Sequence, residues 1–317
     1  MPRPDDLDPD IRRFIQSVQA GWAAHPALAS VGMNQAREIA ERVRAPWAAG
    51  GPQMAGVSDI GVPHGDGAVG VRLYTPDADA GPGPVLVYLH GGGWTLFSIA
   101  THDRLMREYA HRTGFRVAGI DYSLSPEAPF PRALDETASV IGWLRDHGAG
   151  IGIDAGRMAI GGDSAGANLA LSAAIDLRDA GQGGLIKALL LNYGAFDERC
   201  DRLSHRRYDG PAYMLGSEEM RTFWRNYLGG DRADAPTRAA PIRADLHALP
   251  PAFLCIAECD VLRDENVEMA SRLEQAGVAT RSVVYPGTAH SFLEAMSTAP
   301  VADRALDDAA GWLKRTL

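Results

Sequence analysis

The sequence predicts an α/β fold whose mostly parallel sheet is covered by helices on both faces. Short apolar runs, of which 85–89 is apolar throughout, alternate with helical stretches from residue 85 to the end of the chain. Runs without polar alternation are typical of strands buried on both sides, and intervening helices make the connections that parallel strands need. Ligands of such sheets bind beyond the carboxyl ends of the strands.

The alternating elements can be placed along the chain. We expect strands over 85–89, 116–121, 157–161, 186–192, 252–257 and 280–285, and helices over 101–112, 133–147, 165–180, 266–276 and 302–314. Upstream, apolar residues alternate with small or polar ones from Val69 to Leu73, which predicts a half-exposed antiparallel strand.

Two regions outside this alternation predict a helical cap. Apolar residues recur at helical spacing over 11–24, and a second helical stretch over 33–43 should end before Pro46. Residues 194–251 carry no strand signal, and there Ser217 is expected to cap a helix that Gly229 and Gly230 end. We therefore divide the chain into N-terminal cap helices (1–50) and a main α/β domain (51–317) with a cap insertion at about 196–245.

Charge and composition exclude several classes of partner. The 317 residues carry 31 basic and 40 acidic side chains, a net charge of −9 without a basic tract, so neither nucleic acid nor a membrane is an expected partner. The N-terminus lacks an apolar signal core, and no apolar run approaches the ~18 residues of a membrane span, so we expect a cytoplasmic protein. The three cysteines form no disulfide framework or zinc motif, and we expect neither a metal nor a cofactor.

The sharpest motif is G-x-S-x-G at 162–166, between an apolar strand and a helix. A strained turn of this kind projects the hydroxyl of Ser164 beyond the sheet, and glycines flank it because side chains would clash. The alternative is an ordinary Gly-rich turn, which the strand and helix on either side disfavour. We interpret Asp163 as a support of this turn.

A serine hydroxyl needs a base that takes its proton, and that base needs an orienting acid. His290 follows the last predicted strand, so it lies at the same edge of the sheet as Ser164. Asp260 follows the preceding strand and is the predicted acid. Glu258 is the next alternative for the acid, whereas Asp264 is expected to cap the following helix.

A second glycine-rich segment, His90-Gly91-Gly92-Gly93-Trp94, follows the strand over 85–89. Backbone N–H groups of Gly91 and Gly92, together with that of Ala165, would stabilise an oxyanion by about 3 kcal/mol each. The alternative is a phosphate-binding loop, but the spacing matches neither of the common phosphate motifs. We interpret His90 as a hydrogen-bonded anchor of the loop.

These segments together resemble the hormone-sensitive-lipase-like esterases, and the resemblance covers about residues 85–292. It also includes Asp121-Tyr-Ser-Leu-Ser-Pro-Glu127 with Pro129-Phe-Pro131, where Ser123 and Ser125 replace the usual Arg and Ala, and Ser291 stands where the family has Gly. The resemblance implies an α/β-hydrolase fold with an eight-stranded sheet and a helical cap. A homodimer paired through the last strand is a further implication.

The predicted function is a serine carboxylesterase that cleaves short- to medium-chain acyl esters, which are small molecules, through an acyl-enzyme intermediate. The alternatives are an amidase, formamidase or lactonase with the same residues, and a non-catalytic small-molecule receptor, a class that typically lacks the base. We expect about half of the candidate aromatics to belong to the cap core. The candidates for the substrate pocket are Trp94, Asp163, Tyr193, Phe196, Phe223 and Trp224.

Overall fold

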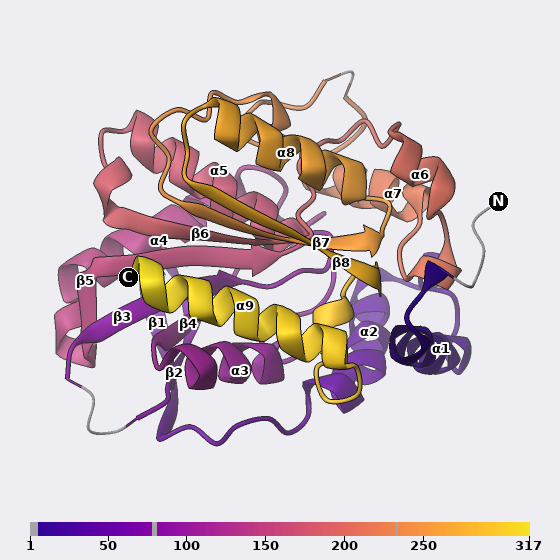
Figure 1. Ribbon diagram of the computed structural model, residues 1–317, viewed down its shortest axis with the longest axis horizontal. Coiled ribbons are helices and arrows are strands. Elements are labelled where there is room, and N and C mark those ends of the chain that lie inside the picture. The colour runs from indigo at the N-terminus through magenta and orange to yellow at the C-terminus, as the bar shows by residue number, and fades with distance from the viewer. Residues whose placement is uncertain (1–5, 78–80, 233) are drawn as a thin grey trace.

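A computed structural model describes residues 6–77, 81–232 and 234–317 of the chain. Its eight strands form one sheet in the order β1-β2-β4-β3-β5-β6-β7-β8 (Figure 1). β2 is antiparallel to β1 and β4, and the other pairings are parallel. The predicted mostly parallel eight-stranded sheet is confirmed. The strands are β1 (Gly56–His64), β2 (Gly67–Thr75), β3 (Gly83–Leu89), β4 (Arg116–Asp121), β5 (Ile153–Asp163), β6 (Ile186–Asn192), β7 (Ala252–Cys259) and β8 (Thr280–Ala289).

Helices cover both faces of the sheet, as the apolar strands require. In β3, Val85 and Val87 belong to the core shared with α4, α5 and α8, whereas Leu86 and Tyr88 belong to the core shared with α3 and α9. This alternation follows from the two-residue period of a strand. The helices are α1 (Pro9–Ala23), α2 (Met33–Ala48), α3 (Asp103–Thr113), α4 (Arg132–His147), α5 (Ala165–Asp179), α6 (Leu203–Arg207), α7 (Ser217–Leu228), α8 (Arg263–Gln275) and α9 (Pro300–Thr316).

Four helices lie outside the regular alternation of strands and helices. Figure 1 shows α1, α2, α6 and α7 on the side of the molecule toward which β7 and β8 point. This is the side where the loops that follow the parallel strands emerge. Within the described parts of the chain, no helix is both long and apolar enough to cross a bilayer.

The second N-terminal helix is longer than predicted, because α2 continues through Pro46 to Ala48. A proline in the last turn removes only one helical hydrogen bond, and the chain beyond it is free to leave the helix. Trp47 also packs edge-on against Phe14 of α1, with ring centroids 4.7 Å apart, and this contact stabilises the extra turn. The predicted end before Pro46 was therefore wrong.

The predicted N-cap of α7 was also wrong. The helix begins at Ser217 itself, and the residue before it, Gly216, has no side chain that could cap it. The Ser217 hydroxyl donates to the carbonyl oxygen of His205 at 3.0 Å, and Asp209 supplies the missing acceptor instead, because its carboxylate accepts from Ser217 N at 2.6 Å. A loop residue eight positions upstream thus caps the helix.

Candidate active site

Ser164 occupies a strained turn between β5 and α5. Its backbone has φ 54° and ψ −118°, a region that residues other than glycine rarely adopt. The turn brings the chain close to β3: a Cβ atom on Gly162 would lie 2.4 Å from the carbonyl oxygen of Leu89, and one on Gly166 would lie 1.9 Å from it. Only glycine fits at both positions, which explains the spacing of the motif.

The three residues predicted as a triad lie in one hydrogen-bonded row. Ser164 Oγ is 3.0 Å from His290 Nε2, and His290 Nδ1 is 2.7 Å from Asp260 Oδ2. All three side chains are buried. Burial by itself lowers the pKa of His290, but the charge and hydrogen bond of Asp260, together with the charges of Asp163 and Glu219, outweigh it, so this pKa is raised above its ordinary value. The row can pass a proton from the hydroxyl to the imidazole.

The two alternative acids are engaged elsewhere. Glu258 Oε2 accepts from Gly287 N at 2.8 Å, so its carboxylate binds the backbone near the end of β8. Asp264 Oδ2 accepts from Ser204 N at 2.9 Å and thereby ties α6 to the start of α8. Of the three carboxylates considered from the sequence, Asp260 is the one that reaches His290.

The structure corrects one predicted oxyanion donor. The N–H group of Gly91 points at Asp163 and donates to its Oδ1 at 3.2 Å, so it is not available to a substrate. The structure gives no protein acceptor for the N–H groups of Gly92, Gly93 and Ala165 within the described parts of the chain. Gly92 has φ +113° and Gly93 φ +60°, and this left-handed backbone turns the loop after Gly91.

Asp163 is the centre of a buried polar cluster beneath this loop. Besides Gly91, it accepts from Tyr88 Oη at 2.9 Å and lies 3.3 Å from His102 Nε2. Burial raises the pKa of Asp163, but the charge and hydrogen bond of His102, together with the hydrogen bond from Tyr88, outweigh burial and hold the pKa of this carboxyl below its usual range. Asp163 therefore supports the elbow and the oxyanion loop, and its buried carboxylate does not line a substrate pocket. No motif in the sequence pointed to His102.

His90 is held as a neutral anchor. Burial lowers the pKa of His90 to about 3, so the ring carries no charge near neutral pH. Its Nδ1 lies 2.6 Å from the carbonyl oxygen of Gly91, and its ring stacks on Tyr122 with centroids 4.3 Å apart. Tyr122 Oη in turn donates to the carbonyl oxygen of His90 at 2.7 Å. These contacts fix the start of the Gly-rich loop.

Most of the predicted pocket aromatics belong to the core. Trp94 and Phe196 expose no surface, and Trp224 exposes 2%, so a substrate does not reach them in this structure. Trp94 instead stacks on Tyr227 of α7 with centroids 4.2 Å apart. We therefore withdraw these three from the predicted pocket.

The remaining two aromatics adjoin the reacting groups. Tyr193 is also almost fully buried, and its ring packs edge-on against the imidazole of His290 at 5.1 Å between centroids. Phe223 is 9% exposed and covers Gly93, since a Cβ atom there would lie 2.2 Å from Phe223 Cγ. Phe223 is therefore the predicted pocket residue that best fits its role.

Sequence reasoning missed a group that joins α2 to this site. Arg44 Nη1 lies 2.8 Å from Glu294 Oε2 in an ion pair whose side chains are 6% and 9% exposed. The Arg44 guanidinium also stacks over Phe97, 4.9 Å from the ring centroid. Phe97 lies beside Gly92, where an added Cβ would come within 2.8 Å of its ring. These contacts join positions too far apart in the chain for a local pattern to show them.

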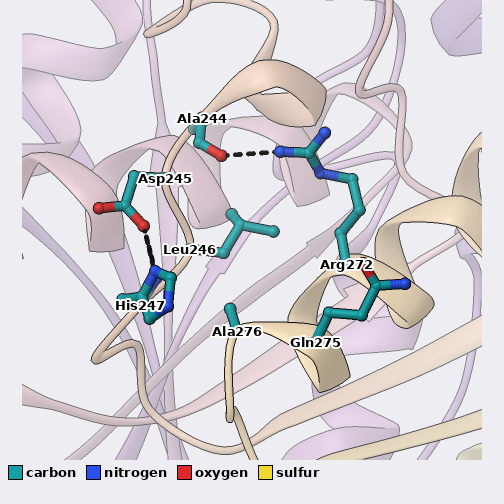
Figure 2. Close-up of a pocket in the computed structure, with 7 residues that line it drawn as sticks. All are labelled: Ala244, Asp245, Leu246, His247, Arg272, Gln275 and Ala276. Atoms are coloured by element: carbon teal, nitrogen blue, oxygen red, sulfur yellow. Dashed lines mark hydrogen bonds and ion pairs between the residues drawn. The ribbon is translucent and has the colours of Figure 1, made fainter.

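A separate surface pocket of about 310 Å³ lies between residues 244–247 and the end of α8 (Figure 2). Asp245 Oδ1 lies 2.7 Å from His247 Nδ1, and Arg272 Nη2 donates to the carbonyl oxygen of Ala244 at 3.0 Å. None of the predicted site residues lines it. Over residues 6–77, 81–232 and 234–317, no group of three or more His, Cys, Asp or Glu side chains is placed to hold a metal ion.

A family model described as the alpha/beta hydrolase fold matches residues 86–294. An ethyl acetate hydrolase from Pseudomonas putida is 35% identical over 308 residues, covering 95% of this chain and 96% of that protein. An acetyl esterase from Salmonella dublin is 34% identical, covering 96% and 93%. A solved structure of a hyperthermophilic esterase from the archaeon Pyrobaculum calidifontis superposes with a TM-score of 0.90 at 33% identity, covering 99% of each chain.

The fold and these similarities define an α/β hydrolase. The chain belongs to the alpha/beta hydrolase fold family, in its hormone-sensitive-lipase-like branch. The resemblance inferred from the sequence motifs is thereby confirmed.

Proposed function

We propose that the chain is a serine carboxylesterase in which Ser164 is the nucleophile, His290 the general base and Asp260 the orienting acid. His290 Nε2 takes the hydroxyl proton, Ser164 Oγ attacks the ester carbonyl, and the imidazolium then protonates the leaving alcohol. A water molecule, activated by the same imidazole, releases the acid from the acyl-enzyme. Asp260 holds the imidazole tautomer with a proton on Nδ1 and stabilises the imidazolium.

The oxyanion hole in this proposal consists of the N–H groups of Gly92, Gly93 and Ala165. Gly92 and Ala165 are retained from the sequence prediction, and Gly93 takes the place of Gly91, whose N–H donates to Asp163. Donors that carry no protein acceptor are free to meet a developing negative charge. Since Ala165 opens α5, its N–H group also belongs to the positive end of a helix.

The observation that carries the proposal is the hydrogen-bonded row from Ser164 Oγ to His290 Nε2 at 3.0 Å and from His290 Nδ1 to Asp260 Oδ2 at 2.7 Å. The chain is a carboxylic ester hydrolase, since full-length relatives in its family are named as ester hydrolases. We further propose a preference for esters of short acids. It is supported by the relatives named for ethyl acetate and acetyl esters, and by Phe223, which lies directly against the oxyanion loop.

The proposed substrates are small-molecule esters. We propose that the helices of residues 1–50 and the insertion at about 196–245 act together as the cap over the main domain of residues 51–317. A cytoplasmic location and a homodimer stay predictions, which cell fractionation and light scattering would check.

The test is the hydrolysis of p-nitrophenyl acetate, butyrate, octanoate and palmitate by the wild type, Ser164→Ala and Ser172→Ala. Ser172 is a matched control: it is buried in α5, the helix that begins directly after Ser164, and its hydroxyl has no hydrogen-bond partner among the residues that the structure describes. We expect turnover of the short esters, a loss of about 10³-fold or more in Ser164→Ala, and no loss in Ser172→Ala. Equal rates in the wild type and Ser164→Ala would contradict the proposal.

A further inference from the structure

One edge of α7 runs along the Gly-rich loop. Asn226 Nδ2 lies 3.5 Å from Thr95 Oγ1, and Phe223, one turn earlier, lies against Gly93. Residues four apart share a helix face, so Glu219 continues this row by one further turn. The row runs from the loop back to the first turn of α7.

The first turn of α7 is fixed on the other side of the site. Ser217 Oγ lies 3.1 Å from His205 Nδ1 of α6, and Ser204 Oγ of the same helix donates to the carbonyl oxygen of Val261 at 2.6 Å. Val261 directly follows the proposed acid Asp260. Glu219 therefore stands between the oxyanion loop on one side and the Asp260 turn on the other.

The carboxylate of Glu219 is close enough to His290 and to Arg44 to interact with both charges. Glu219 is an exposed residue in crowded surroundings: desolvation raises the pKa of its carboxyl, and a backbone hydrogen bond from Gly216, which favours the charged form, holds the carboxylate in place. This is the reciprocal arm of a capping box, in which an acidic residue in the first turn reaches back to the residue before the helix. The position of the charge is therefore fixed rather than free to swing away.

The other charges around His290 are already matched. Asp260 is bonded to His290 itself, Asp163 faces His102, and Arg44 is paired with Glu294. Glu219 forms no ion pair with another described residue. Among the charged groups next to His290, the Glu219 carboxylate is therefore the one whose negative charge is not matched by a described partner.

We propose that Glu219 determines specificity for the alcohol part of the ester, favouring alcohols with a positive charge and disfavouring those with a negative charge. This inference rests on the proposed function. The leaving alcohol takes its proton from His290 Nε2, so it must lie beside His290, where the Glu219 carboxylate acts on it. Aminoalkyl and choline esters are the chemical class that this charge would favour.

The expected size of the effect is modest. Glu219 is exposed to solvent, and water screens a charge pair far more than a protein interior does. We expect Glu219 to change kcat/KM between a cationic ester and its neutral isostere by about two- to fivefold at low ionic strength.

The experiment compares acetylcholine with 3,3-dimethylbutyl acetate, which has the same shape with carbon in place of the charged nitrogen. The kcat/KM ratio of the two esters is measured for the wild type, Glu219→Gln and Glu218→Gln. Glutamine keeps an acceptor for the Gly216 N–H group and removes only the charge. Glu218 is the matched control, because it is the neighbouring exposed carboxylate and pairs with Arg221 at 3.2 Å. The ratio should fall about two- to fivefold in Glu219→Gln and stay unchanged in Glu218→Gln.

Two further readouts separate this role from a structural one. With the neutral ester, the acid limb of kcat/KM should move to lower pH in Glu219→Gln, because a negative charge that favours the His290 imidazolium is gone. In the wild type, the cationic preference should weaken when salt is raised from about 0.02 M to about 0.5 M, which tests the proposal even if the variant is unstable.

The outcomes distinguish the two proposals. If the wild type shows no Ser164-dependent hydrolysis of either ester, the proposed function fails and the role of Glu219 fails with it. If both esters are hydrolysed but the ratio is the same in Glu219→Gln and insensitive to salt in the wild type, only the role of Glu219 is overturned.

Discussion

The ring of Phe223 lies directly on the backbone of Gly93, so closely that a Cβ atom there would stand 2.2 Å from Phe223 Cγ. Phe223 belongs to α7 of the cap insertion, and Gly93 belongs to the loop whose N–H groups we propose as oxyanion donors. The side chain that covers the loop and the donors beneath it therefore form one packed unit. A change in either residue must move the other.

The first prediction tests this contact with Gly93→Ala. The new methyl group must displace the Phe223 ring, and its backbone must hold φ +60°, which is unfavourable for alanine. We expect kcat to fall by about 10²-fold, because a displaced oxyanion donor costs about 3 kcal/mol. Steady-state kinetics on a short p-nitrophenyl ester measure the loss.

Gly142→Ala is the control for this substitution. Gly142 lies within α4, and an added Cβ there meets no atom within 4 Å. Alanine in a helix should be neutral or stabilise the protein by about 0.5–1 kcal/mol, with unchanged kinetics. Full activity in Gly93→Ala would mean that the loop adapts to the added methyl group. It would contradict the idea that the contact between Phe223 and Gly93 holds the oxyanion donors in place.

The second prediction distinguishes the three candidate acids. Asp260→Asn removes the charge on His290 and favours the wrong tautomer, and we expect kcat to fall by about 10⁴-fold. Glu258→Gln and Asp264→Asn should each retain activity within about tenfold, because their carboxylates bind Gly287 N and Ser204 N instead. Comparable losses in all three variants would remove the distinction on which the choice of Asp260 depends.

The third prediction concerns pH. His290 must be neutral to act as a base, and the pKa of its imidazole is raised because the Asp260 charge and hydrogen bond, with the charges of Asp163 and Glu219, outweigh the opposing effect of burial. Activity should therefore be lost as pH falls, with a midpoint in kcat/KM above the ordinary imidazole value of about 6.5. A pH–rate profile on a neutral ester measures it, and a midpoint well below 6.5 would contradict the direction of the shift.

The sequence predicted those parts of the site that depend on local patterns. Ser164, Asp260 and His290 each follow a strand of one parallel sheet, so their strand order alone placed them at the same edge. The G-x-S-x-G turn could be predicted because its glycines lie against the backbone of Leu89. Only glycine fits at these positions, so the constraint determines the residue type in the sequence.

Other parts depend on how side chains turn and on contacts between distant segments. Whether the N–H group of Gly91 faces a substrate or Asp163 is decided by the twist of the loop, which the run of glycines does not encode. The sequence predicts Trp94 in the pocket because it is aromatic and adjacent to the loop. Its ring stacks on Tyr227 of α7 instead, a contact between residues more than a hundred positions apart that a local pattern does not show.

The last prediction concerns the buried ion pair between Arg44 and Glu294. It joins α2 to the turn over Phe292–Ala295, which Ser291 separates from His290. Arg44→Met leaves the Glu294 carboxylate buried without a partner, and we expect the free energy of unfolding to fall by about 3–5 kcal/mol. In Arg44→Met/Glu294→Leu both charges are gone, so most of that loss should be regained, since a well-packed apolar pair often replaces a buried ion pair without cost. Urea denaturation of Arg44→Met, Glu294→Leu and the double variant measures the coupling energy between the two side chains.

Arg42→Met provides the matched control, because Arg42 lies on the same helix and pairs with Glu38 at 3.2 Å while both side chains remain exposed. Its loss should cost less than about 1 kcal/mol, since solvent screens surface pairs. If Arg44→Met were no more destabilising than Arg42→Met, the pair would not hold α2 to the His290 loop. A double variant as unstable as Arg44→Met alone would instead show that the loss comes from the packing of the Arg44 side chain over Phe97, and not from an unpaired charge.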